Sequence, residues 1–324
     1  MAFTIGSLGN LKVDLNTSAH KIRKELVKLP LIGAQTTLKH MTLRPGLRMA
    51  ETIGELAGDI QYGPYSSTYK DANNITINPR TLEVFFGSVI KDFDPNEVAQ
   101  SIYGQAITKG KELQNADIVA QILPWLMAKL GANLNASIWD ATRNASGHTT
   151  KDLFNGFDTI TATEVAAGTI AAGNGNYEKF SAAITDTNAV DVLQAFVQSA
   201  SDELQGHEIE VDPVKLFCSY DIFNKYNQAY AKVVGVQVYN KEYTKRFVEG
   251  TNVELVPLVN KKASNYVTLS SKANMLVGVN QVGEEETVAV DMFGPFTLTM
   301  SATMFFGTQF ESIDKSRLKI GELA

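Results

Sequence analysis

The sequence lacks several features that would assign it to a familiar class of protein. It has one cysteine among 324 residues, and no stretch comes near the roughly 18 uncharged apolar residues that a membrane span needs. Its start lacks the basic segment and apolar run of a signal peptide. Acidic residues outnumber basic ones, 35 to 29, for a net charge of −6. We therefore expect a cytosolic protein that is neither built on disulfides nor an electrostatically driven nucleic-acid binder, and we do not expect DNA as a specific ligand.

The sequence also lacks the usual patterns of an active site. None of its four histidines pairs with another at the spacing that places two imidazoles on one helix face. His207-Glu208 begins like the H-E-x-x-H motif, but Val211 stands where the second histidine is needed. Cys218 ends an apolar run with no histidine near it in sequence, which favours a buried strand cysteine over a nucleophile.

One acidic run, Glu284–Glu286, has the residue type that binds calcium or magnesium. It lies between the apolar segments 275–279 and 287–290, which favours a solvated hairpin turn instead. We expect no catalytic residue, no cofactor and no metal site. The remaining enzyme hypothesis is an α+β enzyme whose site lies on scattered residues.

The first quarter of the chain has little core-forming sequence. Helical spacing in 17–29 predicts a short amphipathic arm that Pro30 ends. Residues 41–80 are rich in glycine, proline and tyrosine, with strand-like alternation at Ile75–Ile77 and Pro79 as a stop. A long excursion of this kind is unusual in a compact domain, so we expect it to contact another molecule.

The strongest helical pattern runs from Asn115 to Thr142. An apolar residue recurs there at every fourth position: Ile118, Ile122, Leu126, Leu130, Leu134 and Ile138. This spacing predicts one long helix, a spine, buried along its Ile/Leu stripe and kinked by Pro124. Its two tryptophans, Trp125 and Trp139, are interpreted as packing residues.

The remaining segments mix helices and strands as an α+β fold does. Before the spine, the patterns predict a strand over 82–90 and a helix over 95–109; after it come helices over 188–204 and 221–233, a strand over 214–219, a loop over 236–260, and strands over 266–269, 275–279, 287–292 and 296–310.

This order of elements resembles the major capsid proteins of tailed bacteriophages, whose Hong Kong ninety-seven type fold is shared with encapsulins. Several segments carry the resemblance: the loop Leu153-Phe154-Asn155-Gly156, the helix 188–204 followed by Val214-KLFCSYDIFNKYNQAYAKV, and the ending Asn274-MLVGVNQVGEEETVAVDMFGPFTLTMSATMFFGTQF with Asp291. The likeness covers nearly the whole chain, but it rests on element order and degenerate patterns.

The resemblance implies an α+β fold of five parts. These are an N-terminal arm (1–40), an extended loop (41–80), a peripheral domain (81–188) with the spine helix (115–142), an axial domain (189–281), and a return strand of the peripheral domain with a C-terminal tail (282–324).

The resemblance also implies a function. We expect a major capsid protein that self-assembles into hexamers and pentamers, forming the icosahedral head shell around the double-stranded DNA genome, which it binds without sequence specificity. The alternative of the same fold is an encapsulin-like shell that holds cargo enzymes. A separate scaffolding protein, a portal and decoration proteins are the partners implied, with assembly in the host cytoplasm and a final location in the virion capsid.

Two segments supply candidates for contacts between subunits. In the extended loop they are three tyrosines and its one lysine, and in the predicted loop 236–260 they are charged residues of both signs: Tyr62, Tyr65, Tyr69 and Lys70, and Lys241, Lys245, Arg246 and Glu249. Some capsid proteins of this family crosslink a loop lysine to a neighbour's asparagine. No partner motif accompanies Lys70, so the crosslink is not carried over.

Overall fold

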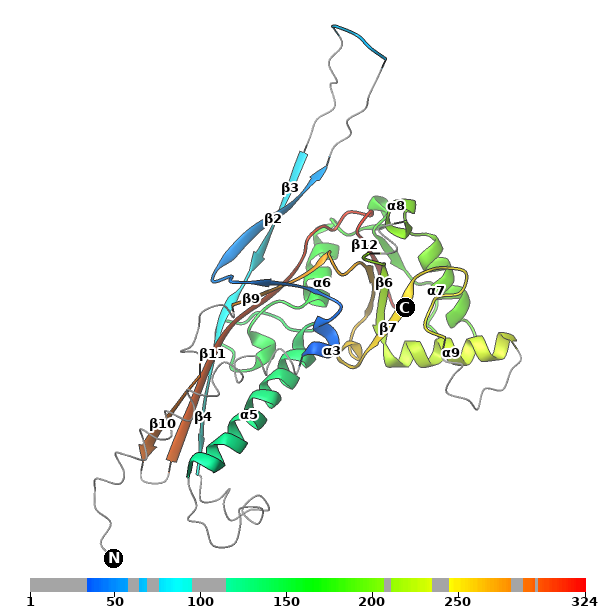
Figure 1. The fold of residues 1–324 in the computed structure, drawn as a ribbon. Helices are drawn as coiled ribbons and strands as arrows, with labels where there is room; N and C mark the ends of the chain where they lie inside the picture. Colours follow the sequence, from blue (N-terminus) through cyan, green and yellow to red (C-terminus); the bar gives the residue numbers. More distant parts are fainter. Residues whose placement is uncertain are drawn as a thin grey trace, which may run out of the picture.

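The computed structural model describes residues 34–57, 64–68, 76–94, 115–206, 211–234, 245–280, 288–294 and 297–324. Within these residues the chain forms two five-stranded sheets and a two-stranded antiparallel ribbon. Figure 1 shows the ribbon projecting from one end of the molecule, while the strands of the first sheet and one long helix extend from the other. The predicted helices over 17–29 and 95–109 lie outside the described residues.

The first sheet, called the main sheet, is organised by its longest strand. β11 (Thr297–Phe310) pairs along one side with β4 (Phe85–Phe93) and along the other with β9 (Met275–Val279) and β10 (Val288–Gly294). β1 (Thr42–Pro45) runs parallel to β9 at the edge.

β9 and β10 therefore lie end to end along one side of β11. Val279 pairs with Phe306, and Val288 pairs with Ala302. The predicted hairpin between these two strands is wrong, because both strands pair with β11 and not with each other. The acidic run Glu284–Glu286 lies between them, outside the described residues.

The spine helix is α5 (Asn115–Ser137), which ends five residues before the predicted Thr142. The reason is tertiary: the backbone N–H groups of Phe157 and Asp158 donate to the carbonyls of Ile138 and Trp139, at 3.2 and 2.9 Å. These bonds fix the chain in a turn where α6 (Phe157–Ala167) begins.

The apolar stripe of α5 is buried progressively toward its C-terminal end. Leu126 and Leu130 are partly buried, whereas Leu134 and Ile138 are buried completely. Trp139 is buried as expected, but Trp125 is 60% exposed, so its interpretation as a packing residue within this chain is wrong. Among the described helices, none is both long and apolar enough to span a bilayer.

The second sheet runs in the order β5 (Tyr177–Lys179), β12 (Leu318–Glu322), β8 (Tyr266–Ser270), β6 (Lys215–Ser219) and β7 (Glu254–Leu258). α7 (Ala189–Gln198), α8 (Asp202–Gln205) and α9 (Tyr220–Val234) accompany it. Four short helical segments complete the described elements: α3 (Gln35–Leu38), η2 (Thr150–Asp152), η3 (Ala172–Asn174) and η5 (Val259–Lys261).

Alternate residues of the second sheet enter two different cores. Leu216 and Cys218 of β6 pack with α7 and α9, whereas Phe217 between them packs with Trp139, Phe157 and other residues near α6. The sheet is thus buried on both faces, as its nearly continuous apolar strands require. Cys218 is fully buried, and burial raises the pKa of its thiol to about 12, which confirms the structural interpretation.

Two expectations in this region are corrected. The predicted helix over 188–204 is broken, because the hydroxyl of Ser201 accepts the N–H of Leu204 at 3.2 Å and caps α8 as a separate helix. The predicted loop 236–260 contains β7, which pairs in parallel with β6.

The sheets divide the chain differently from the expected ranges. β9, placed in the axial range 189–281, belongs to the main sheet, and β12, placed in the peripheral range 282–324, belongs to the second sheet.

A buried ion pair joins η5, the short helical segment after β7, to α6. Lys261 of η5 is fully buried, with its Nζ 3.1 Å from a carboxylate oxygen of Asp158 on α6 and 3.8 Å from the ring centre of Trp139. Burial lowers the pKa of Lys261, while the carboxylate of Asp158 opposes that shift. Removing one partner alone would leave the other charge buried and unpaired, which is strongly destabilising.

The ribbon consists of β2 (Ala50–Ala57) and β3 (Thr76–Glu83). The single strand predicted over 82–90 is therefore wrong, because residues 82–83 belong to β3 of the ribbon and residues 85–90 belong to β4 of the main sheet. The chain leaves the ribbon at Glu83 and enters the main sheet at Phe85. Pro79, predicted as a stop, lies inside β3 opposite Gly54. A two-stranded ribbon has an open edge on each strand, so a residue without an N–H group is tolerated there.

Between the ribbon and β4, the chain at residues 83–84 crosses one face of the main sheet, over a pair of glycines. Gly278 of β9 and Gly307 of β11 lie opposite each other in register. A Cβ atom on Gly307 would lie 1.9 Å from the carbonyl oxygen of Glu83, and one on Gly278 would lie 2.5 Å from a methyl group of Val84. Only glycine at these two positions lets the backbone at 83–84 lie directly on the sheet.

We predict that Gly307→Ala destabilises the protein by about 1–3 kcal/mol, because the added carbon meets backbone rather than a side chain that can move. The melting temperature should fall by roughly 2–4 °C per kcal/mol. Gly173→Ala is the matched control, since a Cβ there meets nothing within 4 Å. Equal melting of the two variants would show that the crossing is not tightly packed.

Candidate functional site

Among the described residues, the projecting ribbon packs against the core of its own chain only at its base. Its base is buried: Ile53 and Leu82 pack with Leu276 of β9 and with Leu47. Farther out, residues 64–68 are all exposed, and Tyr65 is 97% exposed. The ribbon is thus anchored at one end and reaches away from the body at the other (Figure 1).

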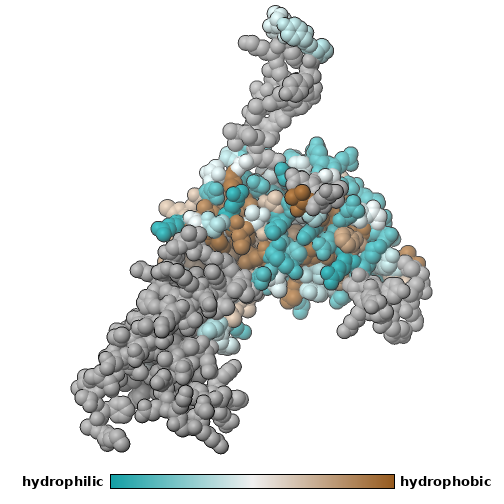
Figure 2. Space-filling model, in the orientation of Figure 1, coloured by the Kyte–Doolittle hydropathy of each residue, from teal (hydrophilic) through white to brown (hydrophobic). Residues whose placement is uncertain are grey.

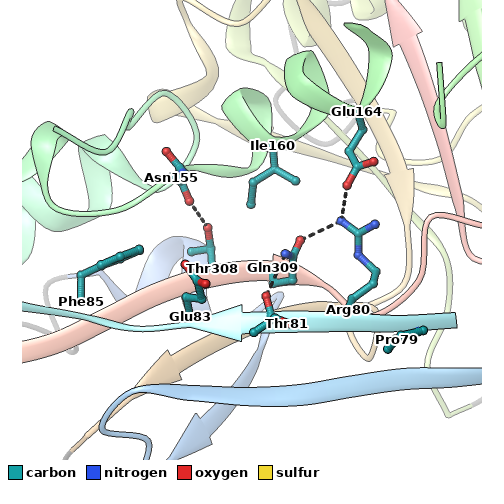
Figure 3. A pocket seen from close by; sticks show the side chains of 10 residues that line it. All are labelled: Pro79, Arg80, Thr81, Glu83, Phe85, Asn155, Ile160, Glu164, Thr308 and Gln309. Carbon is teal, nitrogen blue, oxygen red and sulfur yellow. Dashed lines mark hydrogen bonds and ion pairs between the residues drawn. The ribbon is translucent and has the colours of Figure 1, made fainter. Parts of the chain in front are cut away.

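Arg80 is the polar anchor of the ribbon. Its guanidinium donates to the carboxylate of Glu164 on α6 at 2.7 Å, to the side-chain oxygen of Gln309 at 3.0 Å and to the carbonyl of Phe310 at 3.1 Å. The side chain of Arg80 is 14% exposed and that of Glu164 is 21% exposed, so the ion pair is largely shielded from water. Figure 3 shows Arg80 reaching from β3 to Glu164 on α6, with Gln309 beside it.

The hollow around this anchor has a volume of about 350 Å³ and is lined mainly by polar groups. Gln309 also donates to the carbonyl of Thr81 at 3.1 Å, and the hydroxyl of Thr308 donates to the carbonyl of Asn155 at 2.6 Å. Through these hydrogen bonds, the polar side chains of the hollow join β3, β11 and the segment before α6. The arrangement is that of a rigid joint, and it offers no pair of groups placed for acid–base chemistry.

An apolar surface lies on the same face of the main sheet as the ribbon base. Phe86 and Ile90 of β4 are 58% and 71% exposed, and the ring of Phe86 lies 4.8 Å from that of Phe305. On the face drawn in Figure 2, further hydrophobic residues appear on the body just below the root of the ribbon, beside hydrophilic ones. Exposed aromatic and aliphatic groups beside a projecting element indicate a surface for association.

The structure describes four of the eight predicted contact residues. Tyr62, Tyr69, Lys70 and Lys241 lie outside the described residues, and Tyr65 is exposed.

The other three lie against their own chain. The Nζ of Lys245 is 2.7 Å from a carboxylate oxygen of Glu249 and 4.9 Å from the ring centre of Tyr230; its hydrogen bond to Glu249 raises the pKa of Lys245. The carbonyl of Arg246 accepts the N–H of Leu255 at 2.6 Å.

Sequence reasoning missed the anchor and the glycine pair. Isolated glycines inside apolar strands, at 278 and 307, were a usable signal of close backbone approach. Arg80 carried no such signal, because nothing in its neighbourhood in sequence indicates Glu164. Among the described residues, no three His, Cys, Asp or Glu side chains gather as a metal site would require.

Comparison with known proteins identifies the fold. No protein-family model matches the chain, and no curated protein matches it. Solved structures do. The capsid chain of a native GTA particle covers 90% of this chain and 90% of its own, with a TM-score of 0.57 and 11% identity.

Two further capsids agree. The capsid of cyanophage A-1(L) covers 91% of this chain and 92% of its own, with a TM-score of 0.54 and 13% identity. The satellite phage P4 procapsid, solved with its size determination protein, covers 91% and 90%, with a TM-score of 0.52 and 12% identity. These likenesses confirm the α+β, Hong Kong ninety-seven type capsid fold expected from the sequence.

We predict that Arg80→Met lowers the stability of the protein by about 1–3 kcal/mol, because three hydrogen bonds from a charged group are lost and Glu164 loses its counter-ion. Thermal unfolding measures the change, and proteolysis within the ribbon should become faster. Arg48→Met is the control, since Arg48 is exposed. If both variants melt and are cleaved like the parent, Arg80 does not anchor the ribbon.

Proposed function

We propose that this chain is a major capsid protein, which self-assembles into hexamers and pentamers and forms the icosahedral head shell around the genome of a tailed bacteriophage. The observation that carries the proposal is the capsid fold, shared over 90% of this chain and 90% of a capsid chain. The anchored ribbon and the exposed apolar surface beside it support the same conclusion.

The ribbon supports association for a physical reason. A two-stranded hairpin alone is marginally stable in water, and it becomes stable when it packs on another surface. Its base packs on its own chain, but Tyr65 and its described neighbours, 64–68, are exposed. We therefore propose that the ribbon and the segment 58–75 between its strands, which contains Tyr62, Tyr65, Tyr69 and Lys70, contact a neighbouring subunit.

The second-sheet half supplies the other proposed contact. In a ring of identical subunits, each subunit carries two different surfaces, and one surface of each subunit contacts the other surface of the next subunit around the axis. We place one of them on the segment with Lys241, Lys245, Arg246 and Glu249. Lys245 already forms an ion pair with Glu249 in its own chain. Charged residues of a neighbouring subunit must therefore either replace this pair with ion pairs between subunits or approach Arg246.

The capsid function implies further partners. A scaffolding protein made as a separate chain, a portal and decoration proteins are proposed, together with assembly in the host cytoplasm. Among the similar structures, the P4 procapsid contains a size determination protein, which is a partner of that shell. The packaged DNA is proposed to be held without sequence-specific contacts.

We predict that a truncated ribbon abolishes shell formation and leaves the body folded. Ala57 and Thr76 lie directly opposite each other, so an Asn-Gly turn in place of 58–75 closes the hairpin in register. Electron microscopy should show shells for the parent and only small species for the variant, with unchanged circular dichroism. A same-length Gly/Ser replacement separates loss of side chains from loss of length.

Two outcomes would contradict the proposal. Complete shells from the truncated protein would remove the ribbon from the assembly contacts. A parent protein that forms no shells, with or without co-expressed phage head proteins, would overturn the capsid function itself; shells filled with enzymes instead of DNA would favour the encapsulin-like alternative.

We further predict that reversing the charges of Lys245 and Arg246 together weakens ring formation, as measured by mass photometry. Exposed ion pairs contribute at most about 1 kcal/mol each, so the effect should be partial and should shrink as salt increases. Lys225→Glu with Lys232→Glu on α9 is the matched control. Assembly equal to the parent at every salt concentration would remove this segment from the ring contact.

A further inference from the structure

A basic surface stands out in a chain whose net charge is −6. From Ala34 to Ala50 the sequence contains Lys39, Arg44 and Arg48 and no aspartate or glutamate. All three cations are exposed: Lys39 follows directly after α3, Arg44 lies on β1 and Arg48 lies on the turn between β1 and β2. The overall acidity of the chain therefore conceals a local excess of positive charge.

Two lysines from distant parts of the sequence complete this surface. The Nζ of Lys215 on β6 lies 3.4 Å from the Nδ1 atom of His40, next to Lys39. The carbonyl of Lys272, which follows β8, accepts the hydroxyl of Thr42 on β1 at 2.9 Å. The basic surface is defined as Lys39, Arg44, Arg48, Lys215 and Lys272. Lys215 and Lys272 come from two other segments and contact His40 and Thr42, while Arg44 and Arg48 continue the same segment along β1 and the turn after it.

Carboxylates neutralise only part of this charge. Lys215 has Glu254 at 3.7 Å, a long ion pair. Asp212 accepts the backbone N–H groups of Lys272 and Ala273, and its carboxylate adds a second negative charge beside the five cations. Within the described part of the chain, no ion pair forms with Lys39, Arg44, Arg48 or the ammonium group of Lys272. By contrast, Lys151, Lys179 and Lys232 elsewhere on the surface each pair with a carboxylate.

His40 reports the sign of the field at this surface. Burial, followed by the charges of Lys215, Lys39 and Lys272, lowers the pKa of its imidazole to about 4. The ring is therefore neutral at neutral pH, although it is only partly buried. A bound anion would offset the repulsion among these cations.

We infer that the basic surface contacts the phosphate backbone of the enclosed nucleic acid. The inference rests on the proposed capsid function and adds which side of the subunit faces the genome. Long, exposed side chains without fixed carboxylate partners suit phosphates spaced along a polymer, because they adapt to any sequence. A shell needs this mode of binding, since it encloses a genome without reading it.

The number of free cations sets the expected strength. Four of the five are without an ion pair among the described residues, so about four phosphates are neutralised, and the salt dependence should have a slope of about −3.6. The affinity for duplex DNA should then fall by roughly 100-fold between about 50 and 200 mM salt. The affinity for DNA should therefore be weak at physiological salt, which agrees with the net negative charge of the whole chain.

The test measures binding of a short fluorescent DNA duplex to purified full-length subunits before shell assembly, by anisotropy across salt concentrations, because a closed shell would shield an inward-facing surface from added DNA. Lys39→Gln, Arg44→Gln and Arg48→Gln together should reduce the slope by about 3 and lower the affinity at low salt by at least about tenfold. The matched control is Lys151→Gln, Lys179→Gln and Lys232→Gln, which removes the same charge from paired lysines. Melting curves verify that each variant is folded.

Three results would overturn the inference: no binding of the duplex by the parent, equal binding by the two triple variants, or displacement of the duplex by an acidic peptide at lower concentration than by unlabelled DNA. The last would identify an acidic protein segment as the occupant. Shell formation is scored separately by microscopy, so intact shells with any of these results reject the basic surface alone. Absence of shells rejects the proposed function instead.

Discussion

The close contact between the backbone at 83–84 and the glycine pair of the main sheet fixes the position of the ribbon. Because Gly278 and Gly307 have no side chains, the chain crosses β9 and β11 at backbone distance before it enters β4. The crossing divides one apolar stretch into two strands with different partners. It also brings Arg80 within reach of Glu164, so the polar anchor depends on the same contact.

The body lies on one side of this crossing and the ribbon on the other, and the two are stabilised by different contacts. The body is held by β11, which pairs along both sides, and it contains a buried contact between Lys261 of η5, which follows β7 of the second sheet, and Asp158 of α6. The ribbon has its own chain for support only at its base, among the described residues. A rigid base with an exposed end is what a subunit needs in order to reach a neighbour at a defined angle.

Much of this could be predicted from the sequence, because periodicity and element order are local signals. The spine, the strand 214–219 and the long final strand 296–310 all follow from apolar spacing, and their order led to the capsid fold. The misses were tertiary. The end of α5 is set by the carbonyls of Ile138 and Trp139, which accept N–H groups at the start of α6, and β9 and β10 lie end to end because both pair with β11. Neither partner is near in sequence, so no local pattern indicates them.

Backbone hydrogen exchange before and after assembly tests the central claim, that the ribbon is fixed at its base by its own chain and stabilised beyond it by a neighbour. Amides at the base, near Ile53 and Leu82, should exchange slowly in both the unassembled subunit and the shell. Amides near Ala57 and Thr76 should exchange rapidly in the subunit and become protected in the shell. Equal protection of the whole ribbon in both states would contradict the account.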